Sequence, residues 1–226
     1  MTAADQLDFM GDGAAVFRDV VGQAELARLR SLDNRNYAEK PGARSFSPSE
    51  EISGLIGPDG SIGMLAASLC GRPCRAVRII IFDKTADTNW AVGWHQDRTI
   101  AVTEMADLPG FRSWNVKDGI CHVEPPEDIL ARMLTLRLHL DDCGADNGAL
   151  RILPGTHRLG RVTAADALKL GGEREAVNCE AAAGDVLAMR LLTLHASARA
   201  ANPSRRRVLH VDYSPDTLPA PLQWAI

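Results

Sequence analysis

The chain has 226 residues with 25 Lys and Arg against 29 Asp and Glu, so its formal net charge of −4 provides no basic field for nucleic acid. Hydrophobic residues make up 46% of the chain, as in ordinary globular proteins, but no apolar run approaches the ~20 residues needed to cross a bilayer. Residues 1–13 lack a basic region followed by an apolar one, and the cysteines are odd in number, so we expect a cytoplasmic protein with reduced thiols.

The first 75 residues predict helices and loops. Residues 22–34 combine leucines at helical spacing with good helix formers, which indicates a helix. Residues 35–60 are rich in Gly, Pro and Ser, which favours a loop. Residues 61–71 predict a second helix that ends at a glycine. We expect this helical and loop part to belong to the same domain as the rest of the chain.

The later part of the chain predicts antiparallel strands. Residues 74–84 are rich in β-branched side chains, and residues 132–142 alternate strictly between leucines and polar residues. The Asn-Gly dipeptide at 147–148 is a strong hairpin signal. Residues 183–195 predict one strand opened by a Gly-Asp turn, and residues 205–214 predict its return strand after an Asn-Pro-Ser turn.

The polar face of residues 132–142 decides between two kinds of β fold. This face carries Arg137 and His139, which the core of a plain sandwich would not tolerate unpaired. A barrel with a wet lumen would tolerate them, with the leucine face packed against outer helices. We therefore expect a mostly β protein with a double-stranded β-helix (jelly-roll) core over residues 76–214. The N-terminal helices would pack outside this core, within a single domain of residues 1–226.

A short apolar and aromatic stretch carries His95 and Asp97, two residues apart. Side chains at i and i+2 of a strand share a face, so both can aim at one point, while Gln96 and Arg98 point away and are expected to be structural. An imidazole and a carboxylate suit the 2-His-1-carboxylate facial triad, which binds Fe(II) and leaves open positions. Such a pair by itself also occurs as a surface or salt-bridge feature.

The triad needs a second histidine from a distant strand. His139, His157, His195 and His210 are the candidates. His157 follows a Leu-Pro-Gly turn, which predicts a loop position. His195 is favoured because it ends a β-rich run and precedes a hairpin whose return strand carries arginines. The metal ligand and a cation would then lie on two facing antiparallel strands.

Four longer blocks of sequence give this pattern a context. In chain order they are FDKTADTNWAVGWHQD, KDGICHVEPP, LRLHLDDCGADNGALRILPGTHRLG and GDVLAMRLLTLHASARAANPSRRRVLHVDYS. Together they resemble the successive blocks of the phytanoyl-CoA dioxygenase family, over residues 76–214. The resemblance implies a jelly-roll oxygenase that uses Fe(II), 2-oxoglutarate and O₂, with His95, Asp97 and His195 as iron ligands. The intact carboxylate of Asp97 favours hydroxylation or a related oxidation, because halogenating relatives lack it.

The resemblance also implies residues that bind 2-oxoglutarate. It implies an arginine eleven residues after the distal histidine, and this residue is Arg206, whose planar guanidinium suits the distal carboxylate. Arg207 is the alternative if the turn is one residue longer. Ser197 resembles the hydroxyl partner of the same carboxylate. Arg137 stands where the family often has an aromatic side chain, so it is a candidate for the second carboxylate or for a substrate anion. Arg78 is a candidate of the same kind.

The substrate site is expected beside the iron. Residues 113–126 are polar and predict a loop that closes over the metal as a lid. Arg137 and His139 in the lumen indicate a small, polar or anionic metabolite as substrate. The candidate substrate residues are Trp114, Lys117, Asp118 and His122 in this loop and His139 in the lumen.

Two functions from other classes remain open on the sequence. A zinc hydrolase could use the same three ligands to activate water, but it would leave Arg206 and Ser197 unexplained. A non-catalytic jelly-roll module that binds a small molecule would not need three metal ligands together. The oxygenase is therefore the expected function.

Overall fold

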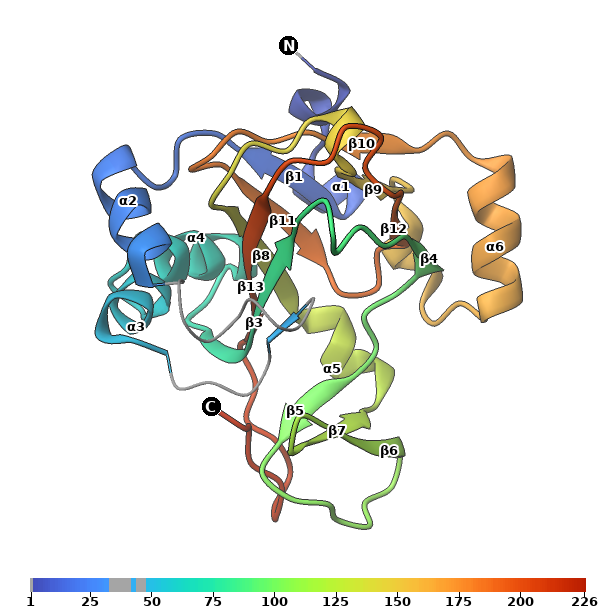
Figure 1. Ribbon diagram of the computed structural model, residues 1–226. Coiled ribbons are helices and arrows are strands. Elements are labelled where there is room, and N and C mark those ends of the chain that lie inside the picture. The colour runs from blue at the N-terminus through green and yellow to red at the C-terminus, as the bar shows by residue number, and fades with distance from the viewer. Residues whose placement is uncertain (1, 33–41, 44–47) are drawn as a thin grey trace.

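Two antiparallel sheets form the middle of the computed structural model (Figure 1), which describes residues 2–32, 42–43 and 48–226. Residues of both sheets line a cavity. The strand order is β1-β11-β8-β13-β3-β2 in the larger sheet and β10-β9-β12-β4 in the smaller one. A third sheet, ordered β5-β7-β6, lies below them in Figure 1. The strands of the larger sheet are β1 (Ala14–Phe17), β2 (Gly42–Ala43), β3 (Arg75–Lys84), β8 (Leu134–His139), β11 (Val186–Arg190) and β13 (Arg206–Ser214). The others are β4 (Val92–His95), β9 (Leu150–Ile152), β10 (Val177–Cys179) and β12 (His195–Ser197), then β5 (Ile100–Val102), β6 (Arg112–Lys117) and β7 (Ile120–Glu124).

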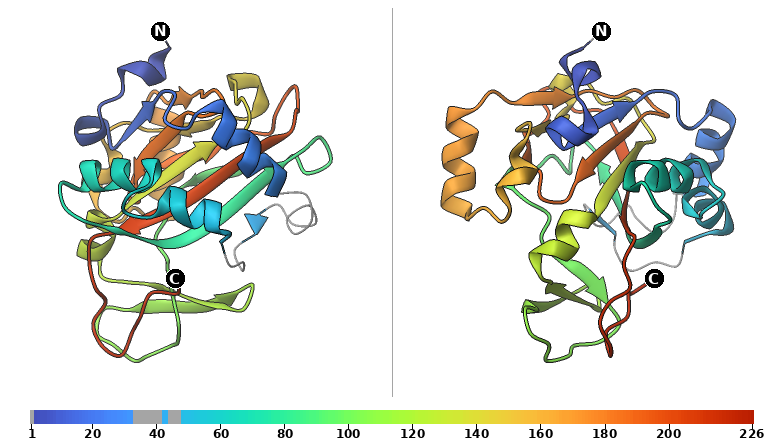
Figure 2. Two further views of the ribbon diagram at one scale, coloured as in Figure 1. Left: turned by 90° about the vertical axis from the view of Figure 1, so that its left-hand side faces the viewer. Right: turned by 180° about the vertical axis from the view of Figure 1, so that it is seen from behind.

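Three helices cover the outer face of the six-stranded sheet, as Figures 1 and 2 show. They are α2 (Gln23–Leu32), α3 (Glu50–Ile56) and α4 (Ser61–Cys70). The leucines of β8 and apolar side chains of these helices form one buried cluster, and the Tyr213 hydroxyl of β13 donates to the Ile56 carbonyl of α3 at 2.8 Å. The other helices are α1 (Phe9–Asp12), α5 (Glu127–Arg132), α6 (Ala164–Glu173) and the 3₁₀ helices η1 (Ala3–Gln6), η2 (Ala145–Asn147) and η3 (Thr156–Leu159).

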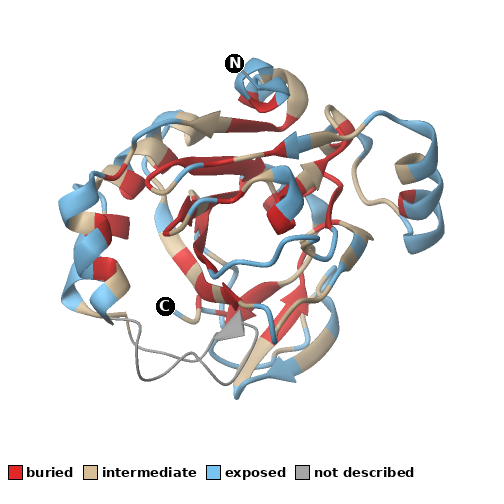
Figure 3. Cartoon of the chain, turned by 45° about the horizontal axis from the view of Figure 1, so that its top comes forward, coloured by how far each residue is buried: buried red, intermediate tan, exposed pale blue. Residues whose placement is uncertain are grey.

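Burial follows the same layers. Figure 3 shows the buried residues concentrated in the strands of the two central sheets and on the inward sides of the helices. Among the described residues, no helix has both the length and the apolar character that a membrane span requires. All five cysteines are free thiols.

The predicted loop at residues 35–60 is wrong in its last part, because residues 50–56 form α3. Ser49 caps this helix by accepting a hydrogen bond from the backbone N–H of Ile52 at 3.3 Å. Ile52 and Ile56 then lie one turn apart on its buried face. The sequence therefore contains a capping residue and apolar residues at helical spacing. The prediction gave more weight to the Gly, Pro and Ser content of the segment than to these two helix signals. Residues 35–41 and 44–47 of the predicted loop, and residues 33–34 of the first predicted helix, lie outside the described residues.

The chain crosses between the sheets at two places where the sequence predicted continuous or hairpin strands. Residues 183–195 are not one strand: β11 belongs to the six-stranded sheet, and β12 begins the return in the four-stranded sheet. The Asn147-Gly148 signal ends η2 with a left-handed glycine (φ 70°) instead of closing a hairpin, because β8 and β9 lie in different sheets. β13 likewise pairs with β3 and β8, not with β12. These crossings build the jelly roll, and apolar periodicity along one strand does not reveal them.

The buried leucine face of β8 generates a test of this packing. Leu136 has no exposed surface and lies opposite Ala188 of β11 and Val211 of β13. We expect Leu136→Ala to lower the free energy of unfolding by about 2–5 kcal/mol, because the lost contacts leave a cavity. The matched control is Leu168→Ala, since Leu168 on α6 is 71% exposed, and we expect a change within about 0.5 kcal/mol. Urea unfolding of both variants measures the difference, and equal losses would contradict the packing described here.

Candidate metal centre

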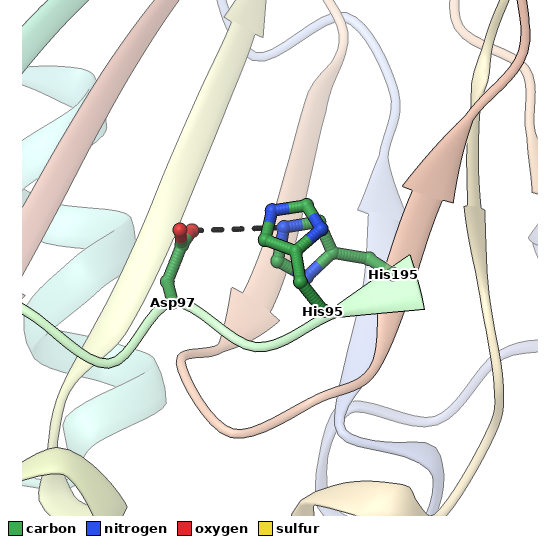
Figure 4. Close-up of side chains that lie close together, drawn as sticks. All are labelled: His95, Asp97 and His195. Atoms are coloured by element: carbon green, nitrogen blue, oxygen red, sulfur yellow. Dashed lines mark ion pairs between the residues drawn. The ribbon is translucent and has the colours of Figure 1, made fainter. Parts of the chain in front are cut away.

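His95, Asp97 and His195 converge on one point between the two sheets (Figure 4). His95 ends β4 and His195 begins β12, and the antiparallel register places these two residues directly opposite each other. Asp97 lies past the end of β4, where its backbone N–H donates to the Leu191 carbonyl at 3.1 Å. One ligand atom from each of the three residues lies within 4.8 Å of the others, with 3.7 Å between His195 Nε2 and Asp97 Oδ2. The predicted shared direction of His95 and Asp97 therefore holds, although only His95 is on the strand.

The hydrogen bonds of the two histidines fix which nitrogen faces the centre. His95 Nδ1 lies 2.8 Å from the Gly93 carbonyl, and His195 Nδ1 lies 2.9 Å from the Thr193 carbonyl. A carbonyl oxygen only accepts, so each Nδ1 carries the proton and each Nε2 keeps a lone pair. This is the tautomer that a metal-binding histidine needs, with its other nitrogen held by a backbone oxygen.

Electrostatics prepare the same three groups as ligands. Burial lowers the pKa of His195 to about 4, which keeps its imidazole neutral. Burial works against ionisation of Asp97, but His195, which is protonated in the acid range where Asp97 titrates, and the guanidinium of Arg78 outweigh burial and hold the pKa of Asp97 below its usual range. Two imidazoles whose Nδ1 atoms are held by backbone carbonyls, together with one carboxylate, fit the donor set of a facial triad.

The residue between the two ligands anchors this segment from behind. The Gln96 amide nitrogen donates to the carbonyls of Gly160 and Leu192, both at 2.8 Å, and its oxygen accepts from the Val162 N–H at 2.9 Å. Arg98 donates to the Val162 carbonyl at 3.2 Å. Both side chains thus have the structural role that strand alternation predicted for them.

The metal centre opens into a cavity of about 280 Å³ between the two sheets. The six-stranded sheet contributes most of its charged wall, and the four-stranded sheet contributes the two histidines and Ser197. The side chains on the six-stranded wall that matter for the chemistry are Arg78, Phe82, Lys84, Arg137, Arg206 and His210.

Only the middle arginine of the basic triplet lines the cavity. Arg206 is buried, and its Nη1 donates to the Gly148 carbonyl at 2.6 Å, while its Nε has no partner. Arg207 instead forms a two-pronged pair with Asp141, at 2.8 and 2.7 Å. Arg205 pairs with Asp83 on the outside of the sheet. The choice of Arg206 over Arg207 as the residue aimed at the lumen agrees with this geometry.

Arg137 and Arg78 both line the cavity, but they differ in their partners. Arg78 Nε donates to Asp212 Oδ2 at 2.5 Å, so its charge is neutralised. Arg137 Nη1 lies 2.9 Å from His210 Nδ1, and the opposite nitrogen of His210 donates to Asp212 Oδ1 at 3.0 Å. His210 therefore supports Arg137 and is not part of the triad. From the sequence, His210 was predicted only as a possible metal ligand, and its contact with Arg137 was not predicted.

The predicted lid at residues 113–126 is a hairpin of β6 and β7, not a loop. The two residues of its turn, Asp118 and Gly119, have φ angles of 51° and 79°. An Asp-Gly dipeptide is typical of such a hairpin turn, but the polar residues around it favoured the prediction of a loop. Lys117 and His122 line the cavity. Trp114 packs against a hydrophobic cluster and Asp118 lies in the exposed turn, so neither lines the cavity.

His139 is also outside the lining of the cavity, although it shares the inward face of β8 with Arg137. It is buried, and burial followed by Arg137 and Arg206 lowers its pKa to about 3. Its predicted contact with the substrate is therefore not supported. Lys84 and Phe82 were missed by the sequence analysis, although strand alternation from Arg78 places them on the same wall.

Comparisons with known proteins agree with this geometry. No curated protein matches the chain. The non-haem α-ketoglutarate-dependent epimerase SnoN from nogalamycin biosynthesis is 18% identical, with a TM-score of 0.65 over 92% of this chain and 80% of that one. EctD from S. alaskensis is 18% identical, with a TM-score of 0.70 over 98% and 80%. HygX from Streptomyces hygroscopicus, solved with nickel and 2-oxoglutarate bound, is 16% identical, with a TM-score of 0.63 over 95% and 87%.

At these identities the similarity establishes the jelly-roll fold. The family profile described as phytanoyl-CoA dioxygenase (PhyH) matches residues 9–208, which is most of the chain. The chain therefore belongs to the phytanoyl-CoA dioxygenase family, whose members are non-haem iron oxidoreductases that use Fe(II), 2-oxoglutarate and O₂.

Proposed function

We propose that this protein hydroxylates, or otherwise oxidises, a small polar metabolite and releases succinate and CO₂ from 2-oxoglutarate. The observation that carries the proposal is the meeting of two groups in one cavity. One is the His95, Asp97 and His195 set, and the other is the buried guanidinium of Arg206, which has no acidic partner among the described residues and whose Nε has no hydrogen-bond partner. A facial triad and a fixed cation are what a chelating dicarboxylate needs at its two ends.

Each residue has a distinct task in this proposal. His95, Asp97 and His195 hold Fe(II) and leave three positions open. Arg206 pairs with the distal carboxylate of 2-oxoglutarate, and the buried hydroxyl of Ser197, two residues after His195 on β12, donates to the same carboxylate. The metal and the cosubstrate supply the oxidising chemistry, while the protein supplies position, charge and exclusion of water.

The two alternative functions account for less of the cavity. A zinc hydrolase would use the three ligands but has no need of Arg206 turned inward. A non-catalytic binding module would use the cavity but has no need of two histidines held in the metal-binding tautomer. No observation on the described residues favours either of them over the oxidation.

The decisive experiment begins with the anaerobic protein, Fe(II) and 2-oxoglutarate. Chelation at a facial triad gives a weak visible charge-transfer band near ~500 nm, whereas zinc or an empty site gives none. A screen of metabolites for stimulated succinate release then identifies the substrate. Absence of both the band and any succinate release would refute the proposed function.

The metal ligands are tested by His195→Ala. Loss of a residue that only hydrogen-bonds a metal ligand lowers metal affinity roughly 10- to 100-fold. Because His195→Ala removes a ligand itself, we expect its iron affinity to fall by more than this, with a normal far-UV spectrum. His157→Ala is the matched control, because His157 on η3 is outside the cavity. Iron content per chain is the measurement. Full iron content in the His195 variant would show that another residue is the third ligand.

The cosubstrate site is tested by Arg206→Ala beside Arg207→Ala. Loss of a charge-assisted contact of ~1.5–3 kcal/mol corresponds to roughly a 10- to 150-fold rise in the dissociation constant for 2-oxoglutarate. We expect this rise for Arg206 only, with normal iron content, because Arg207 is paired with Asp141 outside the cavity. Titration of the visible band measures both variants. Equal effects, or a larger one at Arg207, would reassign the cation.

A further inference from the structure

Three cationic side chains of the cavity wall have no acidic partner. Among the described residues, no carboxylate forms an ion pair with Lys84, Arg137 or Arg206. The neighbouring arginines Arg78, Arg205 and Arg207 are each paired with an aspartate. Asp97 is the only acid among the described residues that line the cavity. Within this part of the sheet, the cations that line the lumen are therefore the ones without an acidic partner, apart from Arg78.

The three cations lie close together on the six-stranded sheet. Lys84 of β3 faces Arg206 of β13 directly across the strand register. Arg137 reaches over β13 toward β3, because its Cζ lies 5.2 Å from the centre of the Phe82 ring, two residues before Lys84 on the same face. Lys84 Nζ donates to the Trp90 carbonyl at 2.7 Å and lies 4.3 Å from the centre of the Trp90 ring.

Repulsion between these cations contributes to the lowered pKa values of Lys84 and Arg137. Burial, together with Arg206 and Arg137, lowers the pKa of Lys84 to about 8. Burial and Arg206 lower the pKa of Arg137 to about 10. Uncompensated buried charge raises the free energy of the folded state, so bound anions would stabilise this wall.

A single molecule of 2-oxoglutarate does not balance this charge. Its two carboxylates and Asp97 together carry three negative charges. Fe(II) carries two positive charges, and on the six-stranded wall Lys84, Arg137 and Arg206 carry three more, while Arg78 is balanced by Asp212. Two positive charges of the metal and the six-stranded wall are therefore left over when metal and cosubstrate are both bound, and a substrate oxyanion can neutralise them.

Arg137 is the cation best prepared for that second anion. Arg206 is held at the Gly148 carbonyl, beside β9 and Ser197, where the cosubstrate carboxylate is placed. Arg137 is held from behind by His210, and its buried Nε has no partner. A guanidinium fixed in this way offers parallel donors to a carboxylate or phosphate at little entropic cost. The rings of Phe82 and Trp90 provide apolar surface for the rest of such a molecule.

We propose that the substrate of this enzyme is an anion whose carboxylate or phosphate group binds Arg137, next to Lys84. The proposal rests on the function proposed above and names the chemical class of its substrate. It distinguishes Arg137, which would serve the substrate, from Arg206, which would serve the cosubstrate.

The test uses the full-length protein loaded with Mn(II) and N-oxalylglycine, a redox-inert mimic of the complex with iron and 2-oxoglutarate. The probes are benzoate and phenyl phosphate, each compared with neutral benzamide by calorimetric titration. We expect at least one anion to bind roughly tenfold or more tightly than benzamide, as a charge-assisted contact predicts. The tighter of the two anions identifies carboxylate or phosphate as the preferred group.

Variants assign this preference to Arg137. We expect Arg137→Met to abolish it and Arg137→Lys to retain part of it, with the dissociation constant for 2-oxoglutarate within about threefold of the unmodified protein. Arg205→Met is the matched control, because Arg205 is a neighbouring cation that pairs with Asp83 and does not line the cavity. It should keep the full preference.

Two results would overturn the inference while leaving the proposed function intact. One is equal affinity of the unmodified protein for the anions and benzamide. The other is a rise of tenfold or more in the dissociation constant for 2-oxoglutarate in Arg137→Met, which would assign Arg137 to the cosubstrate. Failure of the unmodified protein to bind Fe(II) and 2-oxoglutarate would instead overturn the proposed function, and this inference with it.

Discussion

The antiparallel pairing of β4 with β12 is the constraint on which the site depends. It places His95 directly opposite His195, and β12 is held on its other edge by β9. Backbone hydrogen bonds of a sheet therefore set the separation of two ligands, and Gln96 locks the short segment that leads to the third. The metal centre proposed here would be organised before the metal binds, because the sheet and not the ordering of side chains sets its geometry.

The two sheets divide the chemistry between them. The four-stranded sheet carries the two histidines proposed as metal ligands, and the six-stranded sheet carries the cations that face them. The chain passes from one sheet to the other between β12 and β13, so Ser197 and Arg206 approach the same space from opposite walls. The eleven residues from His195 to Arg206 thus lead the chain from one wall of the cavity to the other. The sequence had predicted a hairpin turn at this place, and this prediction was wrong.

Local patterns in the sequence predicted the parts of this protein that depend on one strand or one helix. Alternation along β8 predicted a leucine face toward the helices and a polar face toward the lumen, and both are present. The same patterns failed where partners are distant. The run at 183–195 stays apolar while it changes sheets, so nothing local marks the crossing at β11. His210 was predicted as a possible metal ligand because the sequence does not show its partners. Arg137 is brought to His210 only by the register between β8 and β13, and Asp212 then binds its other nitrogen.

The three arginines of the basic triplet differ in their surroundings and therefore in their roles. Arg205, Arg206 and Arg207 are adjacent in sequence, yet the flanking two are neutralised by aspartates and only the middle one enters the lumen uncompensated. Strand alternation decides which of them turns inward, and the placement of acids decides which keep their charge available. Lys84 and Arg137 follow the same rule, since each projects inward from its own strand and the carboxylate of the same wall, Asp212, is paired with Arg78. The neighbouring arginines Arg78, Arg205 and Arg207 are paired with aspartates, whereas these three cations are not, so their charge stays available for anions that enter the cavity.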